Sequence, residues 1–153
     1  MTGRKRLRLD PDNYAASGSV WHITTPTIDR QPIFGDPAIA QAVVDSLQFQ
    51  CRRCGADLLL YCLMPDHLHA VITVGDVDLV TILHGIKSYT TTIWRRQSGQ
   101  QRLWQETFFD HGVRRSERMD ELVRYVTENP QRAGLVADWR AYPWLGGILL
   151  EDA

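Results

Sequence analysis

The sequence has few cysteines, no long apolar run and almost no net charge, and each absence excludes a class of protein. Three cysteines in 153 residues are too few, and odd in number, for a disulfide-stabilised scaffold. No run of about 18 apolar residues occurs, so no membrane-spanning helix is expected. No apolar segment follows the basic N-terminus, so no signal peptide is expected and the cytoplasm is the expected location.

The composition predicts a single domain over residues 1–153, in which residues 1–18 form a basic N-terminal arm. Hydrophobic residues make up 44% of the chain and charged residues 23%, as in proteins that bury their own core. The net charge is −1, but basic residues gather without acids in residues 1–9 and 87–102. This segregation allows a basic surface on a nearly neutral protein, although such runs are more often solvated faces.

Apolar periodicity, caps and turn residues predict the element order β-α-β-β-α-β-α. The predicted strands are 20–25, 58–64, 67–74 and 108–113, and the predicted helices are 37–54, 79–97 and one that begins after Ser116. Asn129-Pro130 should end or break the last helix, because the residue before proline avoids the α region. Two antiparallel strands between two helices are typical of an α+β, ferredoxin-like split βαβ fold with a central antiparallel sheet.

A histidine pair, His67 and His69, lies on the predicted strand that follows the turn at Pro65-Asp66. Alternate residues of a strand point to one face, so both imidazoles share a face with Val71. Two imidazoles on one face can hold one metal ion, and a polar pair on an apolar strand is unusual as mere packing. The pair alone leaves metal ligands and two hydrogen-bonded histidines equally open.

A zinc site is a competing interpretation of the same histidines. Cys51 and Cys54 form a lone C-x-x-C pair at the end of a predicted helix and could join His67 and His69 around one zinc ion. A single pair of this kind, without a second pair, is more often two reduced thiols, and that interpretation is favoured.

The last predicted helix carries a candidate nucleophile. Tyr125 and Asn129 are four residues apart and therefore lie on one helix face. A tyrosine phenol can form a covalent intermediate, and an asparagine carbonyl can join two imidazoles around a metal. For an isolated tyrosine, a place at the edge of the core is the commoner explanation, with Asn129 as a simple helix cap.

Three segments together resemble the single-tyrosine transposases that carry a His-hydrophobic-His (HUH) motif, and in particular the REP-associated tyrosine transposases. They are residues 64–69 (MPDHLH), 104–114 (WQETFFDHGVR) and 125–136 (YVTENPQRAGLV). The resemblance runs from about Trp21 to Trp144 and implies the HUH endonuclease/transposase fold with a C-terminal helix that bears the tyrosine. Three motifs in the right order make it specific, whereas H-x-H alone would be weak.

The resemblance implies a role for each motif residue. His67, His69 and Asn129 are expected to bind Mg²⁺ or Mn²⁺, and Tyr125 is expected to attack a phosphate of single-stranded DNA. The products would be a 5′-phosphotyrosine and a free 3′-OH, in a DNA transposition and recombination reaction on hairpin-forming repeat DNA in the bacterial cytosol or nucleoid. The enzyme could act as a monomer or a homodimer. The alternative is a domesticated protein that binds single-stranded or hairpin DNA without cutting it.

Three features of the sequence supply candidate DNA contacts: positive charge beside an aromatic ring on the helix predicted over 79–97, which suits a single DNA strand, the basic N-terminal arm, and an arginine directly after the strand predicted over 108–113. They are Arg4, Lys5, Arg6, Arg8, Lys87, Trp94, Arg95, Arg96 and Arg114. The competing interpretation is that Trp94 packs in the core and that the arginines are merely solvated.

Overall fold

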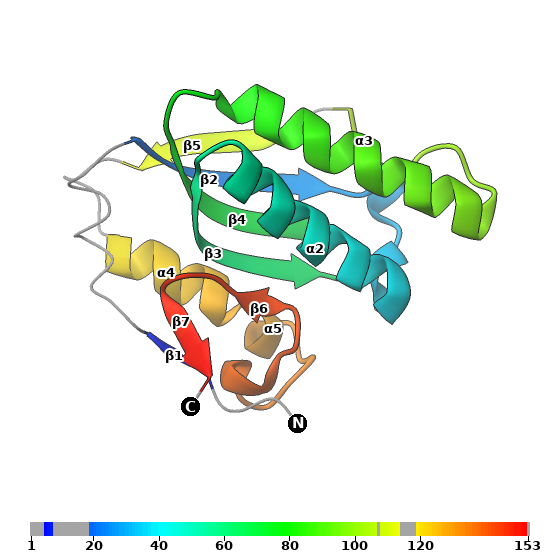
Figure 1. Cartoon of the computed structure of the whole chain (residues 1–153). Coiled ribbons are helices and arrows are strands. Elements are labelled where there is room, and N and C mark those ends of the chain that lie inside the picture. Colours follow the sequence, from blue (N-terminus) through cyan, green and yellow to red (C-terminus); the bar gives the residue numbers. More distant parts are fainter. Residues whose placement is uncertain (1–4, 8–18, 107, 114–118, 153) are drawn as a thin grey trace.

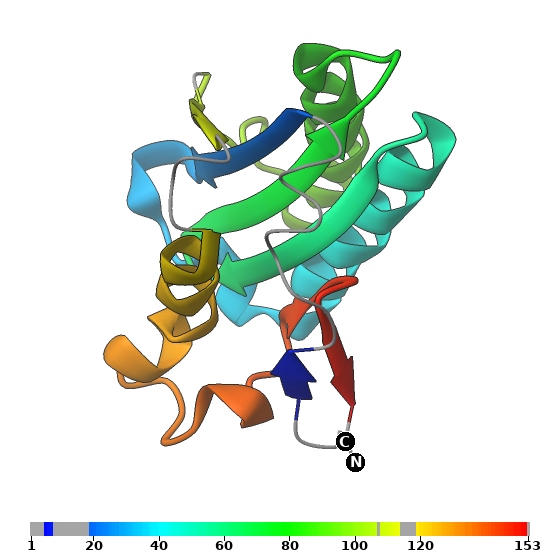
Figure 2. The same ribbon diagram turned by 90° about the vertical axis from the view of Figure 1, so that its left-hand side faces the viewer.

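The computed structural model describes residues 5–7, 19–106, 108–113 and 119–152, and is built on a five-stranded antiparallel sheet. The strand order is β5-β2-β4-β3-β6. Helices α2 and α3 cover one face of this sheet, and α4 lies against the other face (Figures 1 and 2). The strands are β2 (Ser19–Pro26), β3 (Asp57–Met64), β4 (His67–Val74), β5 (Phe109–Val113) and β6 (Leu145–Gly146). The α-helices are α2 (Pro37–Arg53), α3 (Leu79–Ser98), α4 (Met119–Thr127) and α5 (Asn129–Arg132).

Local sequence signals set the bounds of the two long helices. The Asp36 carboxylate accepts a hydrogen bond from the Ala38 amide at the start of α2, and Pro37 occupies the first turn. Asp78 caps α3 in the same way by accepting from Thr81. Gly99 ends α3 in the left-handed conformation, with φ 76°, which costs glycine little because it has no Cβ.

The expected ferredoxin-like arrangement is confirmed. Without the short β6, the order β5-β2-β4-β3 places the first predicted strand beside the third and fourth. The β3–β4 hairpin turns at Pro65-Asp66, and both strands are antiparallel along their length. The helix break is also as expected, since α4 ends at Thr127 and α5 begins at Asn129. The predicted cap Ser116 lies outside the described residues.

The sheet separates two apolar cores. Leu68, Ala70 and Ile72 point from β4 into the core beneath α2 and α3. Val71 points the other way, into the core that α4 closes. Since side chains alternate along a strand, His67 and His69 lie on the α4 side of the sheet. The nine-residue α4 is too short to cover that face completely.

The two ends of the described chain meet in a small second sheet. Strand β1 (Lys5–Leu7) pairs antiparallel with β7 (Leu150–Asp152). Part of the predicted N-terminal arm is therefore a strand. Within the described ranges, no helix has the length and apolar character needed to cross a membrane.

Replacing Ile72 with alanine should destabilise the fold strongly. Its side chain is fully buried between the sheet and α2/α3, and removing it leaves a cavity that costs about 2–5 kcal/mol. Urea unfolding followed by circular dichroism measures this loss. The matched control is the exposed Val80 on α3, where Val80→Ala should change the free energy of unfolding by less than about 0.5 kcal/mol. Equal losses in both variants would contradict the assigned core.

Candidate active site

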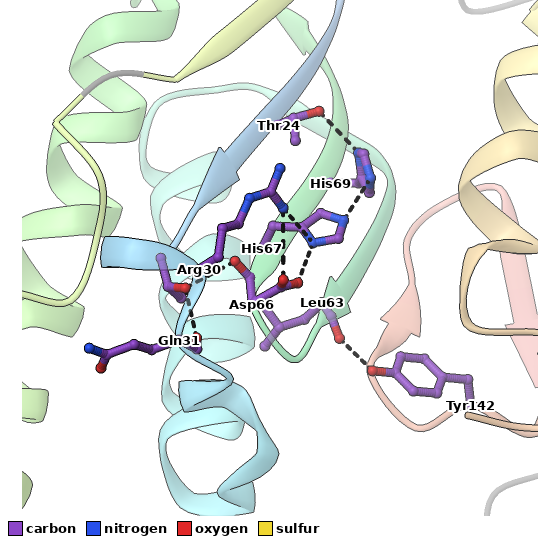
Figure 3. A network of polar contacts seen from close by, with 9 residues as sticks. Thr24, Arg30, Gln31, Leu63, Asp66, His67, His69 and Tyr142 are labelled. Atoms are coloured by element: carbon purple, nitrogen blue, oxygen red, sulfur yellow. Dashed lines mark hydrogen bonds and ion pairs between the residues drawn. The ribbon is translucent and has the colours of Figure 1, made fainter. Parts of the chain in front are cut away.

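The two motif histidines lie side by side at the start of β4, just after the hairpin turn (Figure 3). His69 is buried and His67 is half-buried. Their Nε2 atoms face each other at 3.1 Å. Two metal–nitrogen bonds of about 2.1 Å at a right angle would place two nitrogens about 3.0 Å apart. The pair therefore has the spacing of two ligands of one metal ion.

The Nδ1 atom of each ring lies within hydrogen-bond distance of other side chains. His67 Nδ1 lies 2.7 Å from the Asp66 carboxylate. His69 Nδ1 lies 3.0 Å from His22 Nε2 and 3.1 Å from Thr24 Oγ1. Both partners of His69 come from β2, where Thr24 stands directly opposite His69 in the register. Partners at Nδ1 fix the ring orientation and leave Nε2 as the free ligand atom, as is usual for histidines that bind metals.

The environment keeps the inner histidine neutral. Burial, together with the neighbouring His67 and His22, lowers the pKa of His69 to about 3. Burial also lowers the pKa of His22, with a smaller effect from His111. Burial disfavours the charged imidazolium, so His69 is neutral at physiological pH. A neutral imidazole has the lone pair that a metal requires.

Tyr125 lies beside this pair within the same chain. Its ring centroid is 5.8 Å from that of His69 and 6.5 Å from that of His22, in both cases edge to face. The residue is 51% exposed, although its neighbours Val123 and Val126 are buried in the core under α4. The amphipathic helix thus anchors its apolar face and leaves the phenol open to an incoming molecule.

An arginine from the next helix lies over the tyrosine. The Arg132 guanidinium is 4.8 Å from the Tyr125 ring centroid, within cation–π range. It also donates to the Tyr125 carbonyl and forms an ion pair with Glu128 at 3.8 Å. These contacts connect α5 to the last turn of α4 and place a positive charge over the Tyr125 ring.

Asn129 begins α5, one helical turn after Tyr125, and is half-buried. Among the side chains that the structure describes, no hydrogen bond joins Asn129 to either histidine. The same part of the chain contains no group of three or more His, Cys, Asp or Glu side chains placed to hold a metal. Among the described side chains, the two histidines are therefore the convergent nitrogen donors of this site.

The zinc interpretation is wrong for this fold. Cys51 is buried in the core between the sheet and α2/α3, whereas His67 and His69 lie on the opposite face. Cys54 caps α2 just before the start of β3, whereas the histidines follow the other end of β3, at Met64. Burial raises the pKa of the Cys51 thiol to about 12, so the thiolate that zinc requires is disfavoured.

The predicted DNA contacts on α3 divide into two groups. Arg95 and Arg96 are exposed, and Lys87 is half-buried, donating to the Gln105 carbonyl at 3.1 Å. Burial lowers the pKa of Lys87. Lys87 and Arg95 line an open groove of about 410 Å³. Trp94 is a correction: it is 9% exposed and packed in the core, so its ring is not available to stack on a base.

The remaining predicted contacts fall in or near the masked segments of the chain. Arg4, Arg8 and Arg114 lie outside the described residues. Lys5 and Arg6 belong to β1, for which only the backbone course is described.

Sequence reasoning missed several residues that the fold brings to the histidines. Thr24 and His22 alternate on β2, and that pattern identifies them only once β2 is known to pair with β4. Arg30 and Asp66 come from the two turns at the same end of the sheet. Phe109 lies opposite Thr24 on β5, on the same face as His69, and is 66% exposed. An exposed aromatic on an open sheet face offers a surface for a base, the role once expected of Trp94.

The burial of neutral His69 should make the fold less stable in mild acid. The folded pKa near 3 lies below the unfolded value, so only the unfolded chain takes up a proton as the pH falls below about 6.5. Between about pH 7.5 and pH 5 the free energy of unfolding should drop by up to about 2 kcal/mol through this group. Urea unfolding with a chelator present measures it, and His69→Gln should lose less stability than the wild type. An equal loss in both would contradict a neutral buried His69. His84→Gln, at an exposed position on α3, is the control.

Comparisons with known proteins show the family of the chain and the likeness of its fold. Residues 15–129 match the family model described as "Transposase IS200 like". The solved structure of a REP-associated tyrosine transposase bound to a REP hairpin is similar, with a TM-score of 0.71 and 22% identity over 84% of this chain and 76% of that one. A putative transposase from Deinococcus radiodurans R1 has a TM-score of 0.54 and 18% identity over 72% of this chain and 88% of its own.

The comparison with curated proteins finds no match. The two solved structures are too distant in sequence to show more than the fold, which is the fold expected from the sequence. The family model covers about three quarters of the chain, from before β2 to the residue that starts α5. The protein therefore belongs to the IS200-like transposase family.

Proposed function

We propose that this transposase nicks and rejoins single-stranded DNA through a covalent 5′-phosphotyrosine at Tyr125. The observation that supports this most is the placement of an exposed tyrosine beside two convergent imidazole nitrogens in a single chain. Phosphodiester attack requires an aligned nucleophile and neutralisation of charge more than a strong base. Both requirements can be met on this face of the sheet.

The bond changes assign a task to the tyrosine. The Tyr125 oxygen attacks the phosphorus and loses its proton, a P–O bond to tyrosine forms, and the bond from phosphorus to the 3′ oxygen breaks. The 3′ oxygen takes up a proton and leaves as a free 3′-OH. Because the phosphotyrosine conserves the energy of the broken bond, attack by another 3′-OH rejoins DNA without ATP.

The histidines would hold a divalent cation that contacts the phosphate. Their Nε2 atoms and the Asn129 amide oxygen form a neutral donor set that suits Mn²⁺ or Mg²⁺ with positions left open. When bound, the cation would neutralise phosphate charge and favour the phenolate. Asp66, His22 and Thr24 keep the two rings in place.

The expected substrate is a single strand next to a hairpin. A relative of the same fold has been solved bound to a REP hairpin, and Arg30 and Arg132 place positive charge beside His67 and Tyr125. Lys87 and Arg95 line the groove beside α3, and Phe109 is exposed near the histidines. Because Tyr125 reaches His69 within one chain, a monomer is sufficient for the chemistry, and a homodimer is not required.

Tyr125→Phe should abolish adduct formation. The wild type, incubated with a hairpin oligonucleotide carrying single-stranded flanks and Mn²⁺, should form a protein–DNA adduct that survives denaturing electrophoresis. Phenylalanine keeps the ring packing but lacks the attacking oxygen. Tyr89→Phe, at an exposed tyrosine on α3, should form the adduct as the wild type does.

Two outcomes would contradict the proposal. An adduct that persists in Tyr125→Phe would remove the tyrosine from its role. Salt-sensitive hairpin binding with no adduct under any divalent metal would instead support a domesticated DNA-binding protein.

Mn²⁺ should stabilise the folded protein through the histidine pair. A ligand that binds only the native state adds about 2.7 kcal/mol at about 100 times its Kd, which a thermal melt detects as a shift of several degrees. His67→Ala and His69→Ala should lose this shift, and Asn129→Ala should reduce it. His84→Ala, on the other side of the sheet, should retain it. An undiminished shift in both His67→Ala and His69→Ala would place the metal elsewhere.

A further inference from the structure

The loop after β2 holds two residues in an unusual backbone conformation. Asp29 has φ 53° and Arg30 has φ 55°, in the left-handed region that residues with a Cβ rarely adopt. Two consecutive residues of this kind lie in the 3-10 turn η1 (Ile28–Arg30). Such conformations persist only where the surrounding structure enforces them, and they gather at sites that bind ligands.

The loop is fastened to the hairpin that carries the histidines. The Thr27 amide donates to the Asp66 carbonyl at 2.9 Å, and the Thr27 hydroxyl approaches the same carbonyl at 3.1 Å. The hydroxyl also donates to the Gln31 carbonyl at 2.7 Å. Thr27 is fully buried. These bonds hold both ends of the strained turn, and so fix the direction in which Arg30 leaves the backbone.

That direction is towards the histidine pair (Figure 3). The Arg30 Nη1 atom lies 3.5 Å from His67 Nδ1 and 3.9 Å from the Asp66 carboxylate. The same Nδ1 lies at only 2.7 Å from Asp66, and its proton is best directed to that carboxylate. Since guanidinium nitrogens are donors only, Arg30 is adjacent to His67 rather than tightly bonded to it.

Most of the donor capacity of Arg30 is therefore unused. The side chain is 57% exposed, and its long contact with Asp66 is weaker than a close ion pair. Next to a metal bound by the two imidazoles, the arginine would add electrostatic repulsion, which a bound anion would relieve. A DNA phosphate is such an anion, and the planar guanidinium suits its oxygens better than any other side chain.

We infer that Arg30 is a phosphate-binding catalytic residue, which contacts a non-bridging oxygen of the phosphate that Tyr125 attacks. This inference rests on the proposed function and assigns to the site a further positive group, beside His67. Asp66 lies 2.7 Å from His67 Nδ1 and 3.9 Å from Arg30 Nη1, so the two groups that would face the phosphate lie beside one carboxylate. Arg30 stabilises the charge that builds on the phosphate oxygens during attack.

The test compares Arg30→Gln, Arg30→Lys and Asp66→Asn, with Arg53→Ala as the control. Arg53 is exposed at the end of α2, remote from the histidines. The rate of adduct formation on a hairpin oligonucleotide with Mn²⁺ should fall about 100- to 1000-fold in Arg30→Gln. Arg30→Lys keeps the charge but not the fork, and should recover only part of the rate. Arg53→Ala should match the wild type.

The affinity for the hairpin oligonucleotide, measured in the Tyr125→Phe background, shows whether Arg30 contacts DNA or only holds the Asp66 side chain in place. Loss of one phosphate contact should lower the slope of log affinity against log salt by about 1 in Arg30→Gln. Asp66→Asn keeps the arginine and should leave that slope unchanged. If Arg30→Gln kept both the wild-type rate and the wild-type slope, the inference would be overturned. The inference would also be overturned if Asp66→Asn lowered the rate and the salt slope as much as Arg30→Gln does.

Failure of this inference is distinguishable from failure of the proposed function. If wild-type protein forms the Tyr125 adduct and Arg30→Gln forms it equally fast, only the role of Arg30 is lost. If the wild type forms no adduct, the proposed function itself fails. Thermal melts of each variant show whether it is folded. If Arg30→Gln melts early, the test uses the rate of adduct formation by Arg30→Lys, which must then lie below the wild-type rate.

Discussion

The pairing of β4 with β2 is the constraint on which the site depends. Thr24 stands opposite His69 in this register, so one strand supplies the two imidazoles and its neighbour supplies the groups that orient the inner one. A shift of one residue would move His67 and His69 into the core beneath α2 and α3. The apolar residues that alternate with them, Leu68 and Ala70, prevent this because they are buried on that side.

The second requirement is that the tyrosine helix lies over the same face. Val123 and Val126 anchor α4 in the core on the far side of the sheet from α2 and α3, and this packing brings Tyr125 to His69. The helix is short, and Phe109 and Tyr125 on this side of the sheet are exposed among the described residues. Hydrophobic packing thus fixes the geometry of a polar site.

Patterns within a segment predicted most of the fold and the centre of the site. Alternation on 67–74 indicated the shared face of His67 and His69, and the Asp36-Pro37 cap indicated the start of α2. Contacts between distant segments were not accessible in the same way, because His22 and Thr24 gain their meaning only from a register that spans some 45 residues of chain. Trp94 was misassigned as a DNA contact because a helix has one buried face and its edge is hard to locate from spacing alone. The strained turn at Arg30 gave no signal in its residue types.

We propose that Tyr125 becomes covalently linked to a 5′ phosphate beside the two histidines. The most direct measurement is mass spectrometry of proteolytic peptides after reaction of the wild-type protein with a hairpin oligonucleotide and Mn²⁺. We expect the peptide that contains Tyr125 to carry the mass of a 5′-phosphorylated nucleotide fragment, with fragmentation placing it on the tyrosine oxygen. A nucleotide on any other residue, or an unmodified Tyr125 peptide from protein that has cut its DNA, would contradict the account.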